Sequence, residues 1–323
     1  MIGLATRLAL RAAALRERRL SIVLFHHVLS APDALLVDEP DIARFSAQMR
    51  WLRASFNILP LRTAVEQLCA GTLPARALCI TFDDGYRDNA LNAVPVLRSL
   101  GLPATFFVTT RYINGGMMWN DRVVEAVRHW PGTQMELMDF GLGTVGLASG
   151  RQHALAQLLP QIKYRPYADR EALADELLAR SGAATTRMMM DENEIRSLVR
   201  AGMEVGGHTV SHPILCALET RAAADEIRTN KSDLEGIIGA PLSSFAYPNG
   251  QPQRDYDARH IAILRDSGYR CALSTSAGTA AQHTSLYQLP RFTPWDRSAA
   301  KYLARMLVNY FQAPSCVDET VSA

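Results

Sequence analysis

Residues 77–85 read ALCITFDDG. The six residues of Ala77–Phe82 are almost continuously apolar, which is typical of a strand buried on both faces of a parallel sheet. Asp83, Asp84 and Gly85 then supply a turn, because aspartate caps backbone groups and glycine tolerates unusual backbone angles. The stretch therefore predicts a buried strand that ends in two adjacent carboxylates.

Further short apolar segments lie on both sides of this stretch, and the apolar residues between them recur at helical spacing. Strands that alternate with helices form mostly parallel sheets. Seven strands fit one barrel better than two separate domains, so we predict a barrel-like α/β fold. The predicted strands are Ser21–Phe25, Ala77–Phe82, Ala104–Thr109, Met203–Gly206, Ser243–Tyr247, Arg270–Thr275 and Tyr287–Phe292.

The composition is that of an ordinary globular chain. Of the 323 residues, 48% are apolar and 20% are charged, and the net charge of +2 does not indicate a nucleic-acid-binding face. A glycine-rich stretch of about residues 115–181 interrupts the alternation of strands and helices, and we expect an insertion there, between the third and fourth strands. One barrel over residues 20–312, followed by a tail of residues 313–323, then accounts for most of the length.

Residues 1–19 carry five arginines and one glutamate. As a helix they would be basic and amphipathic, with one stripe formed by Leu4, Leu8, Ala12 and Leu15. Such a helix suits the surface of an anionic membrane, and packing on its own domain is the alternative. Arg7 and Arg11 interrupt the apolar run that a signal peptide requires, and no segment is apolar for long enough to span a bilayer.

The cysteines also bear on the compartment. They are scattered, form no C-x-x-C pair, and are five in number: Cys69, Cys79, Cys216, Cys271 and Cys316. This pattern favours reduced thiols over a disulfide framework or a zinc-thiolate site. Together with the amino-terminal segment, it predicts a cytoplasmic protein or one peripheral to the inner membrane. The sequence does not indicate an oligomeric state.

Polar side chains gather directly after the predicted strands. They are His26 and His27 after the first strand, Asp83 and Asp84 after the second, His208 and His212 after the fourth, Tyr247 and Asn249 at the end of the fifth, and Arg291 and Trp295 at the end of the last. In barrels of parallel strands the C-terminal ends meet on one face, where active sites are built. We therefore expect these side chains to share one site.

Singly, each of these patterns is more often a turn or a pair of surface neighbours. Together they predict a metal centre. Two imidazoles four residues apart on one helical turn would point the same way, and one carboxylate would complete three ligands with positions left open for water and substrate. A second carboxylate next to the first could take a proton from the activated water. The set of Asp83, Asp84, His208 and His212 thus predicts metal-assisted hydrolysis.

These motifs resemble those of the NodB-type polysaccharide deacetylases. Thr81–Gly85 looks like the T-F-D-D-G motif of that family, His208–His212 looks like H-[ST]-x-x-H, and Ala246–Gly250 resembles its A-Y-P-x-G variant. The resemblance runs from about Ser21 to Thr110 and from about Asp191 to Asp296. It implies a distorted (β/α)7 barrel, in agreement with the seven predicted strands, and an enzyme that removes N-acetyl groups from amino sugars of a poly- or oligosaccharide.

The resemblance also implies roles for single residues. Asp83 would be the general base, and Asp84, His208 and His212 would bind a divalent metal. Zinc is the default for such a set, and Co²⁺, Ni²⁺ and Fe²⁺ are compatible with it. The backbone N–H of Asn249 would help to stabilise the oxyanion.

The chain departs from the family pattern in three places. Ala246 replaces the arginine that orients the base in many members, and Arg291 is our candidate substitute. The late D-x-x-D-W and L-x-H motifs are absent, so the general acid stays open, and His283 is expected to be a solvated loop residue. His26 could line the site. Tyr247, Phe292 and Trp295 could stack on sugar rings or close the barrel rim.

Two other functions remain open from the sequence. Members of the same family cleave other non-peptide C–N bonds, such as formamides and cyclic imides, and the altered third motif leaves room for that chemistry. A catalytically silent barrel that binds glycan is the other alternative. The four intact residues of the metal and base set favour an enzyme.

Overall fold

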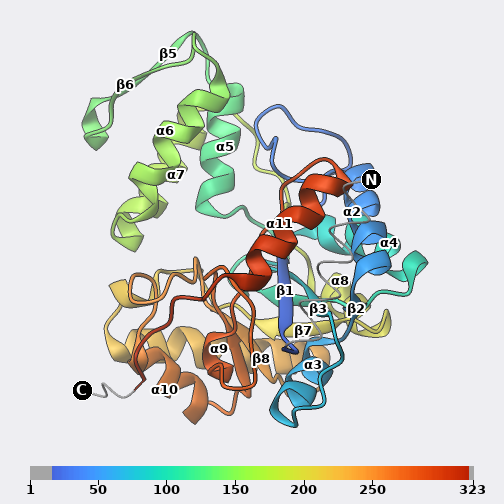
Figure 1. The fold of residues 1–323 in the computed structure, drawn as a ribbon. Helices are drawn as coiled ribbons and strands as arrows, with labels where there is room; N and C mark the ends of the chain where they lie inside the picture. The colour runs from blue at the N-terminus through green and yellow to red at the C-terminus, as the bar shows by residue number, and fades with distance from the viewer. Residues whose placement is uncertain (1–16, 320–323) are drawn as a thin grey trace. The chain divides into compact units, whose positions relative to one another are not determined.

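The computed structural model describes residues 17–319 and divides them into two compact units (Figure 1). The first unit comprises residues 17–31, 38–111 and 190–319, and the second comprises residues 32–37 and 112–189. The first contains all the strands that were expected to end in polar residues. Residues 112–189 of the second fall between the third and fourth of the predicted strands, and residues 32–37 follow the first strand.

The first unit is built on a sheet of parallel strands. Among the described residues its strands are β1 (Leu20–Phe25), β2 (Asn57–Ile58), β3 (Ala77–Phe82), β4 (Thr105–Val108), β7 (Glu204–Gly207), β8 (Ser244–Ala246) and β9 (Cys271–Leu273). The order is β1-β3-β4-β7-β8-β9, and β2 pairs with the first two residues of β3. β1 and β3 are buried along their whole length, as parallel strands covered on both faces should be.

The sheet curls into the expected distorted (β/α)7 barrel, but its seventh strand is not the one that was predicted. The segment predicted as a strand, Tyr287–Phe292, begins in the 3₁₀ turn η4 (Leu286–Gln288) and makes only single bridges, from Leu289 to β9 and from Phe292 to β1. Pro290 and Pro294 lack the N–H that a regular ladder needs there. This irregular segment spans the gap between the two edge strands, and the two-residue β2 is the seventh strand of the sheet.

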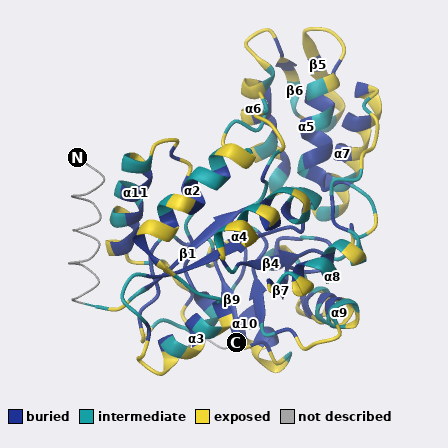
Figure 2. Cartoon of the chain, turned by 90° about the vertical axis from the view of Figure 1, so that its right-hand side faces the viewer, coloured by how far each residue is buried: buried dark blue, intermediate teal, exposed yellow. Residues whose placement is uncertain are grey.

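Helices surround the sheet, whose strands form the buried centre of this unit in Figure 2. They are α2 (Ile42–Ser55), α3 (Leu61–Cys69), α4 (Val94–Leu100), α8 (Glu192–Arg200), α9 (Thr220–Ile238), α10 (Ala258–Asp266) and α11 (Ala299–Phe311), with the short turns η1 (Asn89–Ala93) and η3 (Leu215–Ala217). α9 ends at Gly239, whose φ of +68° is favourable only for residues such as glycine. Each strand of the barrel thereby delivers its carboxyl end to the same face.

The second unit has a core of its own. Its elements are α5 (Trp119–His129), β5 (Gln134–Leu137), η2 (Met138–Phe140), β6 (Gly143–Gly146), α6 (Arg151–Lys163) and α7 (Tyr167–Ser181), and β5 and β6 form an antiparallel hairpin. Val123, Val127 and Leu158 are among its fully buried apolar residues. Arg122 is also buried and pairs with Glu171 of α7. The unit therefore folds around apolar and ionic contacts within residues 112–189.

The ends of the chain and the cysteines complete the fold. The predicted amino-terminal helix falls mostly on residues 1–16, which lie outside the described residues, and residues 17–19 are not helical. Among residues 17–319 no helix combines the length and the apolar character that crossing a membrane requires. All five cysteines are free thiols, as expected.

Candidate metal centre and active site

Asp83 and Asp84 follow β3 directly, and the turn sends their carboxylates to different partners. The N–H of Asp83 donates to the carbonyl of Phe25 at 3.0 Å, which ties the turn to the end of β1. Asp84 has a φ of +73°, a left-handed conformation that aspartate adopts more readily than most residues. At Gly85 (φ +90°) a Cβ would lie 2.9 Å from a Val108 side-chain carbon. The motif needs aspartate and glycine here for backbone reasons as well as chemical ones.

His208 and His212 lie in a loop after β7, and not on one helical turn as the sequence spacing suggested. Thr209 (φ +64°) and His212 (φ +55°) both adopt left-handed conformations. The Thr209 Oγ1 accepts from the His212 N–H at 3.1 Å. The two imidazole rings lie 5.0 Å apart, centre to centre. The rings converge because the loop is tightly turned.

A carboxylate from α9 holds this loop. Glu226 accepts from the N–H groups of Val210 and Ser211, both at 2.9 Å, and from the Ser211 hydroxyl at 2.6 Å. Orphan backbone donors in a turn that is partly buried would otherwise be costly. Glu226 is therefore a positioning residue for the histidine pair, and the sequence analysis did not identify it.

Asn230, also on α9, fixes His208 itself. Its Oδ1 accepts from the His208 N–H at 3.0 Å, and its Nδ2 donates to the carbonyls of Val108 (3.0 Å) and Thr209 (2.7 Å). The sequence analysis also missed this residue. A signal was available, because Asn230 interrupts the apolar stripe of α9 between Ile227 and Leu234 and is fully buried.

The ring of His208 is oriented by a further hydrogen bond. Its Nδ1 donates to the carbonyl of Ala246 on β8 at 2.7 Å, which leaves Nε2 to face Asp84. Outer hydrogen bonds of this kind fix the tautomer of histidines that bind metals. Burial lowers the pKa of His208, but Asp83 and Asp84 outweigh it, and the pKa lies above its usual value.

Three atoms of this site fit a divalent cation. The Oδ1 of Asp84 lies 3.3 Å from Nε2 of His208 and 3.4 Å from Nε2 of His212. Tetrahedral zinc ligands at about 2.1 Å from the metal lie about 3.4 Å from one another. The same Asp84 oxygen is buried and has no hydrogen-bond partner within residues 17–319. Burial raises the pKa of Asp84, yet the two histidines hold it far below its usual value, so the carboxylate is ionised and ready to bind a metal.

Asp83 has a different partner. The Arg291 guanidinium donates to both of its oxygens, with Nη1–Oδ1 at 2.6 Å and Nη2–Oδ2 at 2.8 Å. Both side chains are almost fully buried, and the Arg291 Nε donates to the Ser274 carbonyl at 3.0 Å. Burial raises the pKa of Asp83, but the Arg291 charge outweighs it and the pKa lies below its usual value. Arg291 thus provides the cationic partner of Asp83 that the sequence analysis expected in place of the missing motif arginine.

Of the remaining predicted residues near this centre, His26 is half-buried and Trp295 is exposed. The charge of His26 acts on both Asp83 and Asp84. Trp295 is 48% exposed. The N–H of Asn249 finds no hydrogen-bond partner among residues 17–319, while its carbonyl accepts from the Thr275 hydroxyl at 2.5 Å. A free donor at this strand end is what an oxyanion site requires.

The structure corrects the expectation for Tyr247. Its side chain is fully buried, stacks on Tyr256 with ring centres 3.7 Å apart, and donates its hydroxyl to the carbonyl of Tyr287 at 3.0 Å. Its backbone N–H donates to Leu273. Tyr247 therefore belongs to the barrel core, and it has no atom available to a substrate. The sequence position, next to a motif glycine and asparagine, does not reveal which way the ring turns.

A second set of metal-type ligands, Cys216, Asp257 and His260, has a structural explanation. The His260 Nδ1 accepts from the Asp257 N–H at 3.0 Å, and its Nε2 donates to the carbonyl of Leu215 at 3.1 Å. Both ring nitrogens thus have protein partners: Nδ1 caps α10, and Nε2 ties this helix to η3. Burial lowers the pKa of His260 to about 4, which keeps the ring neutral for this role.

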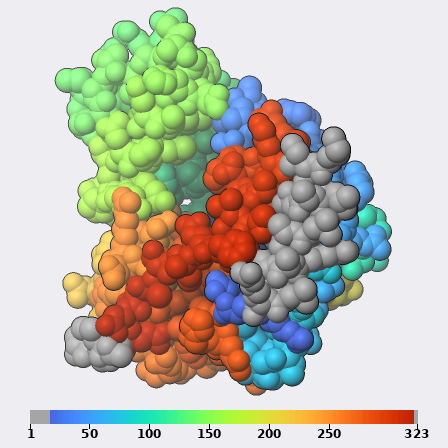
Figure 3. Space-filling model, viewed as in Figure 1, coloured from blue at the N-terminus to red at the C-terminus, as the bar shows by residue number. Residues whose placement is uncertain are grey.

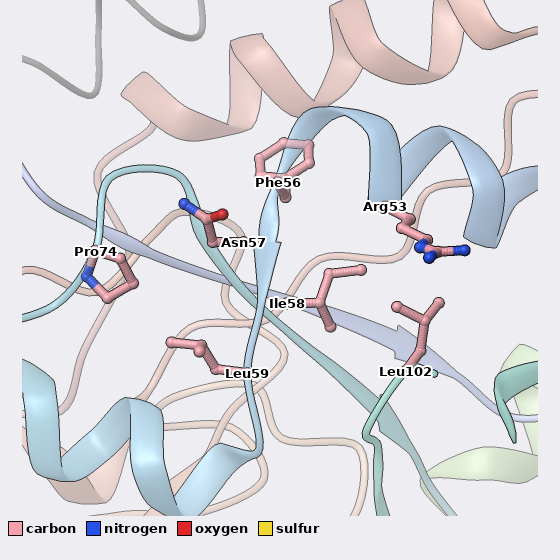
Figure 4. A pocket seen from close by; sticks show the side chains of 7 residues that line it. All are labelled: Arg53, Phe56, Asn57, Ile58, Leu59, Pro74 and Leu102. Atoms are coloured by element: carbon pink, nitrogen blue, oxygen red, sulfur yellow. The ribbon is translucent and has the colours of Figure 1, made fainter. Parts of the chain in front are cut away.

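The described part of the first unit includes the following cavities. One, of about 490 Å³, is lined by Arg53, Phe56, Asn57, Ile58, Leu59, Pro74 and Leu102 (Figure 4). It lies at β2, which pairs with the first residues of β3, and so at the end of the sheet opposite to Asp83. The other, of about 240 Å³, includes His26 and Trp295 in its lining and adjoins the metal centre.

Comparison with known proteins agrees with this geometry. The sequence profile described as polysaccharide deacetylase matches residues 70–146 and 151–272, more than half of the chain. The Bacillus subtilis protein YxkH is 21% identical over 271 residues, which cover 83% of this chain and 69% of that protein. A stretch of 70 residues, 21% of this chain, is 36% identical to the poly-beta-1,6-N-acetyl-D-glucosamine N-deacetylase of Staphylococcus epidermidis, of which it covers 24%.

A solved structure shares the fold. The Streptococcus pyogenes deacetylase PplD in complex with acetate matches with a TM-score of 0.60 and 17% identity, over 90% of this chain and 99% of that one. This structural similarity shows the barrel fold, and the match to the sequence profile shows the family. The chain belongs to the polysaccharide deacetylase family, whose members are hydrolases of carbon–nitrogen bonds in polysaccharides.

Proposed function

We propose that the protein removes N-acetyl groups from N-acetylglucosamine units of a poly- or oligosaccharide, in a metal-dependent hydrolysis with Asp83 as the general base. The observation that carries the proposal is the buried Asp84 oxygen, which has no hydrogen-bond partner among the described residues and faces two imidazole nitrogens at 3.3 and 3.4 Å, beside a second carboxylate paired with arginine. The local similarity to the Staphylococcus epidermidis enzyme supports the sugar class.

Asp84, His208 and His212 would hold the cation, and zinc is the default for two imidazoles and one carboxylate. When bound, the cation supplies Lewis-acid activation of water and of the amide carbonyl. The hydrogen bond from His208 to Ala246 keeps the Nε2 lone pair directed toward Asp84. Co²⁺, Ni²⁺ and Fe²⁺ are compatible with the same ligands.

The protein's own groups supply the proton transfers. Asp83 takes a proton from the attacking water, and Arg291 keeps its carboxylate ionised and in one orientation through two hydrogen bonds. The N–H of Asn249 donates to the oxygen that becomes negative as the water adds to the carbonyl carbon. The C–N bond then breaks, and the proton held by Asp83 passes to the leaving nitrogen. The products are acetate and a sugar ammonium group, which takes up the proton that the new carboxyl group releases, so atoms and charge balance.

Acetate release from N-acetylglucosamine oligomers tests this proposal, together with the metal content of the purified protein. We expect about one equivalent of metal. Asp83→Asn should lower turnover by about 100-fold or more without loss of metal, and Asp84→Asn should lose the metal. His283→Ala serves as the matched control, because this histidine is exposed. Metal-free protein that releases no acetate after zinc addition would refute the proposal.

Two other outcomes would replace it. Turnover of small cyclic imides or formamides, without turnover of the oligomers, would assign a different C–N bond as the substrate. Binding of oligomers with neither metal nor turnover would assign a silent glycan-binding barrel. The intact pair of Asp83 and Arg291 favours the enzyme, since a binding barrel gains nothing from a buried base held ionised.

We also propose that the amino-terminal residues 1–19 contact an anionic membrane surface. The described part of the chain enters the first unit beside α11, where the Tyr310 hydroxyl donates to the Glu17 carbonyl at 2.7 Å. α11 lies at the surface in Figure 3 (red), contains no acidic residue, and exposes Val308 (69%) and Phe311 (65%). Co-sedimentation with vesicles that contain anionic lipid should fall in a double Val308→Glu, Phe311→Glu variant, and equal binding of the variant would contradict the idea.

The cytoplasmic location stays a prediction.

A further inference from the structure

The cavity of about 240 Å³ is built from the segments that also deliver the catalytic residues. Its lining consists of Phe25, His26, Asp38, Glu39, Pro40, Thr293, Pro294 and Trp295. Phe25 is the residue whose carbonyl accepts from the Asp83 N–H, and Thr293 follows Arg291 by two residues. The cavity therefore begins next to the general base and extends away from it toward the loop before α2.

The walls of this cavity suit one sugar ring. Its volume is below the range of about 300–1,000 Å³ that is typical of sites for drug-sized ligands. Phe25, Pro40, Pro294 and Trp295 give apolar surface, and the Trp295 ring is held in place by the Arg305 guanidinium, whose central carbon lies 4.2 Å from the ring centre. Aromatic faces of this kind pack against the C–H faces of pyranoses. A single monosaccharide unit next to the reacting one would fill the cavity.

Two carboxylates give the cavity its charge. Among the described residues, neither Asp38 nor Glu39 has an ion-pair partner within 4.0 Å, and the Glu39 side chain accepts only from the His27 N–H, at 3.3 Å. The Arg44 charge interacts electrostatically with both Asp38 and Glu39, and its guanidinium also donates to the Trp295 carbonyl at 2.6 Å. Both carboxylates are thus available to a ligand.

From this geometry we propose that the cavity binds a glucosamine unit that already carries a free ammonium group, next to the N-acetylglucosamine unit under attack. An acetamido group is neutral and adds no charge opposite to that of the two carboxylates, whereas an ammonium group donates to them and brings the opposite charge. The inference rests on the proposed function and extends it. A deacetylated unit then favours reaction at its neighbour, so free amines accumulate in runs along the glycan.

Defined tetramers test this selectivity on the zinc-loaded, full-length protein. One tetramer is fully acetylated, and the others carry a single glucosamine at each position in turn. We expect kcat/KM to be about two- to fivefold higher for one of the singly deacetylated tetramers, the gain of one partly exposed ion pair. The ratio should fall toward one at high salt, because exposed charges are screened.

Variants test the contribution of the two carboxylates to this selectivity, apart from the rest of the site. Asp38→Asn and Glu39→Gln keep an acceptor oxygen and remove the charge, and the double variant should bring the ratio of kcat/KM values to about one. Asp266→Asn, on the exposed end of α10, is the matched control and should leave the ratio unchanged. Equal kcat/KM for all tetramers, or a preference that survives the double variant, would overturn the inference.

A binding measurement keeps the inference separate from the proposed function. Calorimetric titration with a glucosamine tetramer, below the pH at which its amines lose their protons, should show tighter binding than the acetylated tetramer shows, and the difference should vanish in the double variant. If no tetramer is deacetylated, the proposed function fails, while this titration still decides whether the cavity selects an ammonium group. Equal affinity for both tetramers would refute the selectivity.

Discussion

Replacing Arg291 by methionine removes the cation beside Asp83 and leaves the rest of the site in place. In the native protein two hydrogen bonds of 2.6 and 2.8 Å join these side chains, and both are almost completely buried. Removing one partner of a buried ion pair costs about 3–5 kcal/mol, because the other charge stays buried without compensation. At about 2–4 °C per kcal/mol for a domain of this size, Arg291→Met should lower Tm by about 6–20 °C.

The pH dependence of this loss follows from the pKa of Asp83. With Arg291 present the pKa is lowered, so the ionised carboxylate stabilises the fold above the ordinary carboxyl pKa, and that contribution disappears as the pH falls through the lowered value. Without Arg291 only His208 and His26 oppose burial, which is the largest influence on the pKa of Asp83 and raises it. The Tm difference between the two proteins should therefore be largest near neutral pH and shrink in acid.

The same change should appear in catalysis. A raised pKa of Asp83 moves the acidic limb of the kcat/KM profile to higher pH, because the base must be ionised to accept a proton. Arg291→Lys restores the positive charge without the two-point contact. Its Tm and its pH profile should lie between those of the native protein and of Arg291→Met. The double variant Asp83→Asn, Arg291→Met lacks both charges of this pair and should recover part of the lost Tm. A single variant that melts within about 2 °C of the native protein, with an unchanged pH profile, would refute the reasoning.

Three other changes test the supporting structure. Asn230→Leu leaves the N–H of His208 and two carbonyls without partners and should weaken zinc binding about 10–100-fold in a competition with a chelator; unchanged affinity would contradict its role. Gly207→Ala places a Cβ against the Tyr269 hydroxyl and 2.8 Å from the Asn230 Oδ1, so both melting temperature and zinc affinity should fall, and a native Tm would show that these side chains can move away. Tyr247→Phe removes one buried hydrogen bond and should cost about 1 kcal/mol in urea unfolding while kcat/KM stays native; a large loss of turnover would restore Tyr247 to the site.

Much of the barrel follows from local patterns. The apolar run of Ala77–Phe82 is a strand over the predicted range, because a strand that is buried on both faces needs no alternation of polar residues. The local pair Asp191 and Glu194 opens α8, since each side chain accepts from the backbone of the other residue. The segment before Arg291 was mistaken for a strand, because hydrophobicity does not show that prolines interrupt its hydrogen bonds.

The site was predictable in its chemistry and less so in its geometry. Asp84, His208 and His212 meet as their residue types and order suggested, but they do so through left-handed loop residues and not through a helical turn. Glu226 and Asn230 escaped the sequence analysis because a polar residue on a helix is usually solvated. Only the packing of α9 against the ends of the strands turns them toward the histidine loop.

By itself, then, the sequence determined which residues could bind a metal, which could act as a base, and which segments would be buried strands. These properties depend on residue type and on short-range spacing, and they survive without any knowledge of distant contacts. The tertiary structure decided that Arg291 reaches Asp83 across 208 positions of sequence and that the ring of Tyr247 turns into the core. Such pairings depend on how the barrel closes between β9 and β1, where an irregular segment makes single bridges to both strands and no local pattern predicts its path.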